Sequence, residues 1–224
     1  MGARVELSGG GRSGNGYLAT PATGAGPAVI VIPEWWAVDD AAERVCDRYA
    51  DEGFTALVPD LDAATDAPDE AGRRVMALNL EPAAKQLEGA FDLLAASEAV
   101  RGEGLGVTGF GMGGALALTL AVLRPHDVRA CVPFYGIVPP GAPAPDWSRL
   151  EAPVNGHFAE DDPAFPLEQV RALEETLRAL GKDVHVAFYP AGHGFFDDRG
   201  GASDPESART AWIRALDFFR SKLG

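Results

Sequence analysis

The sequence has few cysteines, few basic residues and no long apolar segment. Two cysteines among 224 residues are too few for a disulfide framework. No apolar run approaches the roughly 18 residues that cross a membrane, and the first residues lack the apolar stretch of a signal peptide. The 19 lysines and arginines stand against 33 acids, and a net charge of −14 disfavours phosphate-rich partners. We therefore expect a cytoplasmic protein that binds neither nucleic acid nor a membrane.

The apolar runs and amphipathic segments predict a single α/β domain over residues 1–224. With 46% hydrophobic residues, a chain of this length can bury a substantial core. Strands alternate with helices, which predicts a doubly wound, mostly parallel sheet flanked by helices. We expect strands at residues 4–7, 17–20, 28–33, 54–58, 105–109, 128–134, 153–158 and 184–189. We expect helices at residues 39–52, 82–97, 166–180 and 205–222, with one more directly after residue 111.

Two segments fit neither pattern. Residues 8–16 are rich in glycine, so we expect a loop between the first two strands. Residues 62–82 are acidic and interrupted by proline, which predicts short helices or loops over the ends of the strands.

Residues 105–123 (LGVTGFGMGGALALTLAVL) have the pattern of a strand, a sharp turn and a helix. Small residues at 109 and 113 would let strand and helix pass closely, as in the G-x-nucleophile-x-G elbow of hydrolases. The central position of this pattern is Gly111, which has no side chain to present. The sequence therefore predicts a nucleophile elbow without a nucleophile.

Loops that follow the other strands carry charged and aromatic residues. Active sites of such sheets lie at the C-terminal ends of the strands. Glu34 and two tryptophans follow one central strand, three acids at 160–162 follow a later one, and His193 follows the last. The chain order elbow, acid, histidine is that of the α/β-hydrolases. We expect His193 and one of these acids to form a functional pair.

Short motifs along nearly the whole chain support this interpretation. They are Tyr17-Leu18-Ala19, Pro33-Glu34-Trp35-Trp36, Gly53-Phe54, Pro59-Asp60-Leu61, the elbow at 109–114, the segment 156–163, Tyr189-Pro190, Gly192-His193-Gly194-Phe195 and Ala211-Trp212. In this order they resemble the dienelactone hydrolase family. The resemblance implies an α/β-hydrolase fold without a large cap domain, and a hydrolase of small esters, lactones or enol-lactones that uses no cofactor.

The same resemblance implies roles for individual residues. The cysteine of the family's Cys-His-Asp triad would fall at Gly111, with Asp162 as the acid and His193 as the base. Glu34 would be the carboxylate that contacts the resting thiol. The backbone N–H groups of Met112 and Trp35 would form the oxyanion hole, and main-chain donors survive the loss of a side chain at Gly111.

Further residues are candidates for substrate binding. Arg199, with Arg73 and Arg74, is a candidate partner for a substrate carboxylate. No metal site is expected, because His193 has no second histidine or cysteine at ligand spacing. The expected partner is a small-molecule substrate, and the protein is expected to be a monomer or homodimer. Aromatic side chains are expected either to line the pocket or to pack in the core: Trp35, Trp36, Phe110, Phe134, Tyr135 and Phe195.

Gly111 allows three interpretations. A thiol hydrolase could have been inactivated by substitution. Alternatively, the glycine is natural and a water molecule fills the void left by the missing side chain, attacking a carbonyl with His193 as general base. Within this second interpretation, the same acid–base pair could instead catalyse proton transfer, dehydration or ring closure. Finally, the chain could bind a small molecule without converting it.

Overall fold

The computed structural model describes residues 2–9, 12–61, 69–197 and 203–224. In this part of the chain eight strands form one sheet in the order β1-β2-β4-β3-β5-β6-β7-β8. The strands β3 to β8 run parallel, and β1 and β2 add antiparallel strands at one edge. The strands are β1 (Ala3–Gly9), β2 (Arg12–Ala19), β3 (Gly26–Ile32), β4 (Thr55–Pro59), β5 (Val100–Phe110), β6 (Val128–Phe134), β7 (Val154–Asp161) and β8 (Val184–Gly192).

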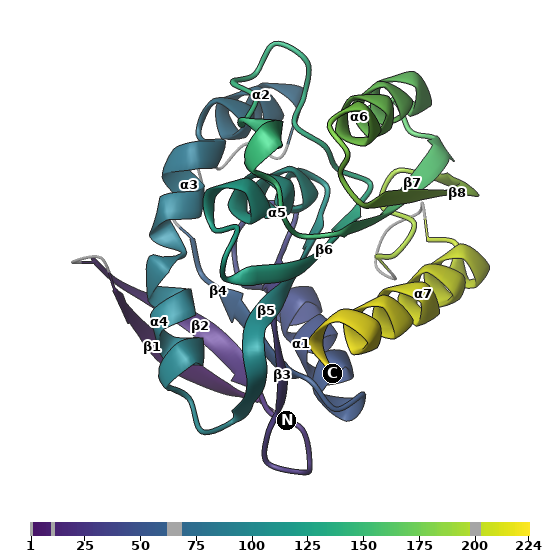
Figure 1. The fold of residues 1–224 in the computed structure, drawn as a ribbon. Coiled ribbons are helices and arrows are strands. Elements are labelled where there is room, and N and C mark those ends of the chain that lie inside the picture. Colours follow the sequence, from purple (N-terminus) through teal and green to yellow (C-terminus); the bar gives the residue numbers. More distant parts are fainter. Residues whose placement is uncertain (1, 10–11, 62–68, 198–202) are drawn as a thin grey trace.

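Helices cover both faces of the sheet (Figure 1). Helices α1 and α7 pack on one face, and helices α2 to α6 pack on the other. The helices are α1 (Asp40–Asp51), α2 (Glu70–Leu78), α3 (Leu80–Gln86), α4 (Glu88–Ala96), α5 (Met112–Leu123), α6 (Leu167–Ala179) and α7 (Pro205–Leu223), with a short 3-10 helix at Trp147–Arg149.

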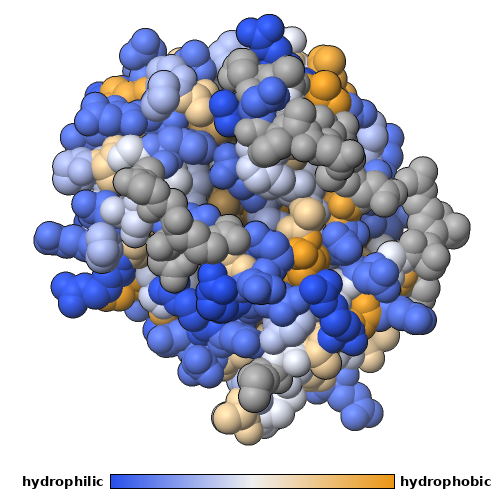
Figure 2. Space-filling view, turned by 180° about the vertical axis from the view of Figure 1, so that it is seen from behind, coloured by the Kyte–Doolittle hydropathy of each residue, from blue (hydrophilic) through white to orange (hydrophobic). Residues whose placement is uncertain are grey.

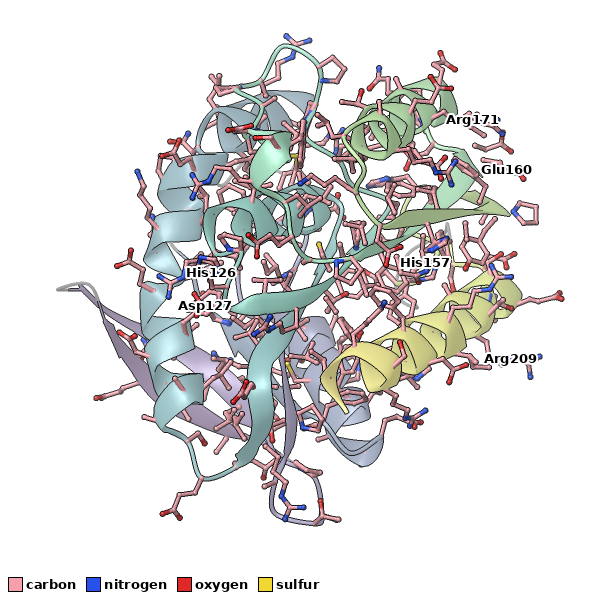
Figure 3. The ribbon with its side chains drawn as sticks, viewed as in Figure 1. His126, Asp127, His157, Glu160, Arg171 and Arg209 are labelled. Carbon is pink, nitrogen blue, oxygen red and sulfur yellow. The ribbon has the colours of Figure 1, made fainter. Side chains whose placement is uncertain are left out.

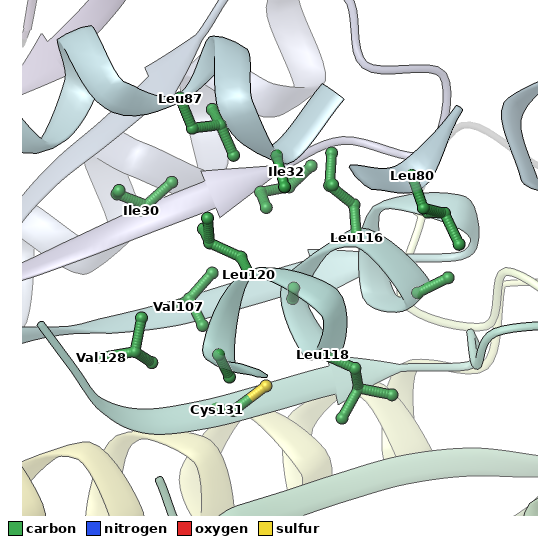
Figure 4. Close-up of a cluster of buried hydrophobic side chains, with 14 of the residues drawn as sticks. Ile30, Ile32, Leu80, Leu87, Val107, Leu116, Leu118, Leu120, Val128 and Cys131 are labelled. Carbon is green, nitrogen blue, oxygen red and sulfur yellow. The ribbon is translucent and has the colours of Figure 1, made fainter. Parts of the chain in front are cut away.

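The central strand β3 explains why its sequence is apolar without alternation. Ile30 and Ile32 point into the core beneath α5, while Val29 and Val31 point into the core beneath α1 and α7. Both faces of a parallel strand are covered, so every position from Ala28 to Ile32 is buried. Helix α5 is apolar all round, and its leucines fill the space against β3, β5 and β6 (Figure 4).

The expected loop at residues 8–16 is wrong. Strands β1 and β2 extend through this segment and pair as far as Gly9 and Arg12. Strand pairing uses backbone groups, which glycine supplies as well as any residue, so the glycine-rich composition concealed the hairpin.

The helix expected at residues 82–97 is divided in two, because a turn at Leu87 separates α3 from α4, and helix α2 precedes them. Asn79 separates α2 from α3 and donates its side-chain amide to the carbonyl of Val75. Pro82 lies in the first turn of α3, where its missing N–H is tolerated. Helix α2 agrees with the short helices expected at 62–82, and residues 62–68 lie outside the described part.

The described surface fits the composition. The face in Figure 2 is mostly hydrophilic, with apolar residues in small separate groups. In the ranges given above, no helix has both the length and the apolar character required to cross a bilayer.

Candidate active site

The turn between β5 and α5 has the geometry of a nucleophile elbow. Gly111 has φ +52° and ψ −122°, a region that glycine enters without the strain a side chain would add. A Cβ atom on Gly109 would lie 2.0 Å from the carbonyl oxygen of Gly113, and one on Gly113 would lie 2.2 Å from that of Ile32. The flanking glycines therefore let α5 pass directly against the strands, as expected.

His193 follows β8 directly and meets Asp162 at the end of β7. The Nδ1 atom of His193 lies 2.8 Å from Oδ2 of Asp162, whose side chain is only 1% exposed. The other oxygen of Asp162 accepts hydrogen bonds from the backbone N–H groups of Ala164 and Phe165. These donors fix the carboxylate in place. Asp162 therefore faces the imidazole, while Asp161 is exposed.

Glu34 meets the other side of the imidazole. Its Oε1 atom lies 3.1 Å from Nε2 of His193. A Cβ atom on Gly111 would lie 2.7 Å from Cγ of Glu34 and 2.9 Å from Oε1. The expected water-sized void beside Gly111 is therefore absent, because the flexible side chain of Glu34 occupies that space and pairs with the imidazole.

The two carboxylates decide the charge of His193. Burial lowers the pKa of His193, but hydrogen bonds and charge attraction from Asp162 and Glu34 outweigh burial and raise the pKa to about 9. The imidazole is therefore protonated at neutral pH. In this arrangement it can donate a proton and cannot accept one.

Two backbone N–H groups lie beside the elbow. Met112 begins α5, so its N–H belongs to the unpaired first turn of a helix, where the helix dipole favours negative charge. Within the described residues, neither this N–H nor that of Trp35 has a hydrogen-bond acceptor. The predicted role of these two groups in an oxyanion hole requires N–H groups that are not already engaged.

A cavity of about 480 Å³ lies between the loop after β3, helix α1 and residues 196–197. Glu34, Trp35, Phe110 and Tyr135 are among its lining residues. Glu34 lines this cavity, whereas His193 is not among the described residues of its wall. Glu34 is thus the member of the Asp162–His193–Glu34 chain that faces the cavity.

The structure places other predicted aromatics in the core. Trp36 and Phe195 are 1% and 0% exposed, and neither lies on the cavity wall among the described residues. Trp36 closes a tight turn, with its N–H bonded to the carbonyl of Pro33 and its indole in the core beneath α5. Phe195 packs between Tyr135 and Tyr189. Phe134 is likewise buried. Arg199 lies outside the described residues.

Helix α1 supplies cavity residues that the sequence analysis missed. Ala41, Arg44, Val45 and Arg48 line the cavity at the spacing of one helical face. Arg48 also lies over the rings of Phe196 and Trp212, with its guanidinium carbon 4.3 Å from the Trp212 ring centre. The amphipathic pattern of this helix was visible, but nothing in it showed that the polar edge would border the site.

The remaining histidines lie elsewhere. His157 is buried within the sheet. His126 lies just before the first residue of β6, at the end of the strand away from Tyr135 (Figure 3). His126 and His185 are mostly exposed and contact Glu151 and Asp183. Within the described ranges, no group of three or more histidine, cysteine, aspartate or glutamate side chains is arranged to hold a metal ion.

Comparison with known proteins places this geometry in a family. The Dienelactone hydrolase family matches residues 15–223. The chain is 32% identical to a "Putative carboxymethylenebutenolidase" of Aquifex aeolicus over 100% of both chains. It is 29% identical to a "Probable 2-oxo-3-(5-oxofuran-2-ylidene)propanoate lactonase" of Bradyrhizobium sp., covering 98% of this chain and 94% of the relative. The crystal structure of a "Putative Dienelactone Hydrolase" from Klebsiella pneumoniae superimposes with a TM-score of 0.85 at 27% identity, over 98% of this chain and 99% of that one. The expected α/β-hydrolase fold is confirmed.

Proposed function

The chain belongs to the dienelactone hydrolase family, and from this premise we propose that it hydrolyses a small ester, lactone or enol-lactone without a side-chain nucleophile. One observation supports the proposal: Glu34 lies beside Gly111, which has no thiol or hydroxyl, and pairs with the imidazole of the Asp162–His193 pair. The family's reaction class is kept, while water takes the place of the covalent nucleophile.

The chain offers the groups that such a reaction needs. The N–H groups of Met112 and Trp35 would stabilise the oxyanion, and one such donor contributes about 10²–10³-fold in known hydrolases. The Asp162–His193 pair would transfer a proton in the reaction, and such general acid–base catalysis raises the rate by about 10²–10⁴-fold. These contributions support catalysis that is slower than with a thiolate but well above the uncatalysed rate.

The cavity supports a small substrate with an apolar ring. Its volume is about 480 Å³, and Trp35, Phe110 and Tyr135 offer aromatic surface beside Glu34. The names of the Aquifex and Bradyrhizobium relatives describe lactone-opening enzymes. A five- or six-membered lactone therefore agrees with the volume of the cavity and with the names of these relatives.

The test is hydrolysis of δ-valerolactone and of benzyl acetate, whose leaving groups are alkoxides, by the purified protein. We expect turnover by the wild type and its loss in His193→Ala, with full activity retained in His126→Ala, which removes an exposed histidine. A protein that binds these compounds without converting them, or that rearranges a lactone without adding water, would contradict the proposal and favour binding or non-hydrolytic acid–base chemistry.

A further inference from the structure

We propose that Glu34 is the general base that activates the attacking water and that His193 is the general acid that protonates the leaving group. This assignment rests on the proposed function and reverses the role expected for His193. It follows from the position of Glu34, whose carboxylate lies where the side chain of a nucleophile at residue 111 would lie.

The position of Glu34 fits a base. Its side chain lines the cavity and is 27% exposed, so a water molecule can reach it. One oxygen, Oε1, pairs with Nε2 of His193. The other oxygen has no hydrogen-bond partner among the described residues, which leaves it open to a water O–H.

The environment of His193 fits an acid. The titratable groups that face its ring are Asp162 directly after β7, Glu34 in the loop after β3 and Tyr135 directly after β6. Burial raises the pKa of Tyr135 well above its usual value, so this phenol stays neutral; Glu34, Asp197 and Asp162 act on it in the same direction. Two carboxylates and no cation therefore face the imidazole within the described part, and they hold it protonated.

The proton balance closes within these residues. Water gives a proton to Glu34 while its oxygen forms a bond to the carbonyl carbon, and the carbonyl π electrons move to an oxyanion held by the N–H groups of Met112 and Trp35. The intermediate then collapses, the bond to the leaving oxygen breaks, and the proton on Nε2 of His193 passes to that oxygen. The proton on Glu34 returns to the imidazole across their 3.1 Å contact. One water is consumed and the site is restored.

Leaving-group dependence distinguishes the two roles. Benzyl acetate and 4-nitrophenyl acetate share an acyl group, but only the benzyl alkoxide requires protonation to leave. We expect Glu34→Gln to lower kcat/KM by about 10²–10⁴-fold on both esters, the usual effect of losing a general base. We expect His193→Gln to lower it to that extent on benzyl acetate and by less than about 10-fold on 4-nitrophenyl acetate. Equal losses on both esters in His193→Gln, with small losses in Glu34→Gln, would overturn the roles and leave the proposed function standing.

Chemical rescue separates a base from a structural carboxylate. In Glu34→Ala the space beside Gly111 is open, so added formate should restore part of the activity. In Glu34→Gln the amide fills that space, so formate should have no effect. Absence of rescue in Glu34→Ala would contradict the role of Glu34. A wild type that cleaves neither ester would overturn the proposed function together with these roles.

A titration that needs no substrate tests the acid. The imidazole of His193, followed by NMR, should titrate near pH 9 in the wild type and at lower pH in Glu34→Gln. A midpoint at or below the ordinary value of about 6.5 in the wild type would leave a neutral ring at pH 7 and overturn the assignment.

Discussion

Two histidines at the β7–β8 edge of the sheet, His157 and His193, have opposite protonation states. His157 in β7 is fully buried, and burial lowers its pKa to about 3, with the charge of Arg214 adding to the shift. Its Nδ1 atom meets the neutral hydroxyl of Tyr189 at 2.9 Å. His193, also largely enclosed, lies between two carboxylates, and its pKa rises to about 9. Burial favours the neutral ring in both, so the charge of the partner decides the outcome.

The comparison also distinguishes a structural histidine, His157, from a reactive one, His193. The ring of His157 packs against that of Phe134 inside the core, with the ring centres 4.9 Å apart and the planes tilted by 35°. His193 is 20% exposed beside the cavity and carries a proton that it can release. Changes that remove the carboxylates from His193 should therefore make it resemble His157 in charge and stop the reaction.

The largest expected effect comes from Asp162→Asn. The amide would place a donor or a neutral oxygen against Nδ1, which lowers the pKa of His193 and disturbs its proton position. We expect kcat/KM for δ-valerolactone, whose leaving alkoxide requires protonation, to fall by about 10²–10⁴-fold. Asp161→Asn is the matched control, because Asp161 is the exposed neighbour and should change little. Equal activity of both variants would show that the imidazole works without its buried carboxylate.

The second prediction concerns stability and pH. Because the pKa of His193 is raised from 6.5 to about 9, its protonation stabilises the fold fully below pH 6.5, and this contribution disappears as pH rises through 9. The shift corresponds to at most about 3 kcal/mol. In urea unfolding, His193→Gln should therefore be destabilised relative to the wild type at pH 6, and the gap should narrow by pH 9.5. A gap that is constant with pH would argue against the ion pairs.

The third prediction concerns Gly111→Cys. The new side chain needs the space of Glu34 and a backbone conformation that costs about 1–3 kcal/mol for a residue with a Cβ atom. We expect a lower free energy of unfolding and displacement of Glu34, with a fall in the pKa of His193. A thiol beside the imidazole should also form an acetyl-enzyme with 4-nitrophenyl acetate, seen as a burst and an acetyl mass increase. Gly111→Ala controls for the strain, and an equal burst in that variant would exclude acylation at residue 111.

The features of the fold and site that could be predicted from the sequence are those that depend on residues close together in the chain. The strand β3 was evident from its unbroken apolar run, and the elbow from its glycines, because both are local patterns. The order of motifs along the chain predicted a pair of His193 with one of the acids at 160–162, and the resemblance to the family singled out Asp162. The contact between Glu34 and His193 joins residues 159 positions apart and depends on one side-chain conformation, so no local pattern contained it. The cavity face of α1 was missed for the same reason.

The smallest effect is expected at His157, and it tests the other half of the comparison. His157→Phe keeps a ring against Phe134 but removes the partner of the Tyr189 hydroxyl, which still accepts a hydrogen bond from Arg214 at 3.2 Å. We expect a loss of about 1 kcal/mol in the free energy of unfolding at pH 7, the usual net value of one hydrogen bond, and unchanged kcat/KM. Because the pKa of His157 is about 3 in the folded protein and about 6.5 in the unfolded chain, the unfolded chain binds this proton first as the pH falls. The wild type therefore loses stability between pH 6.5 and about 3. The variant lacks this histidine, so it should lose less stability than the wild type on acidification. Urea unfolding at pH 7 and pH 4.5 measures both effects. A large loss of activity in this variant would mean that the buried histidine is coupled to the site, and that the division between a structural and a reactive imidazole is wrong.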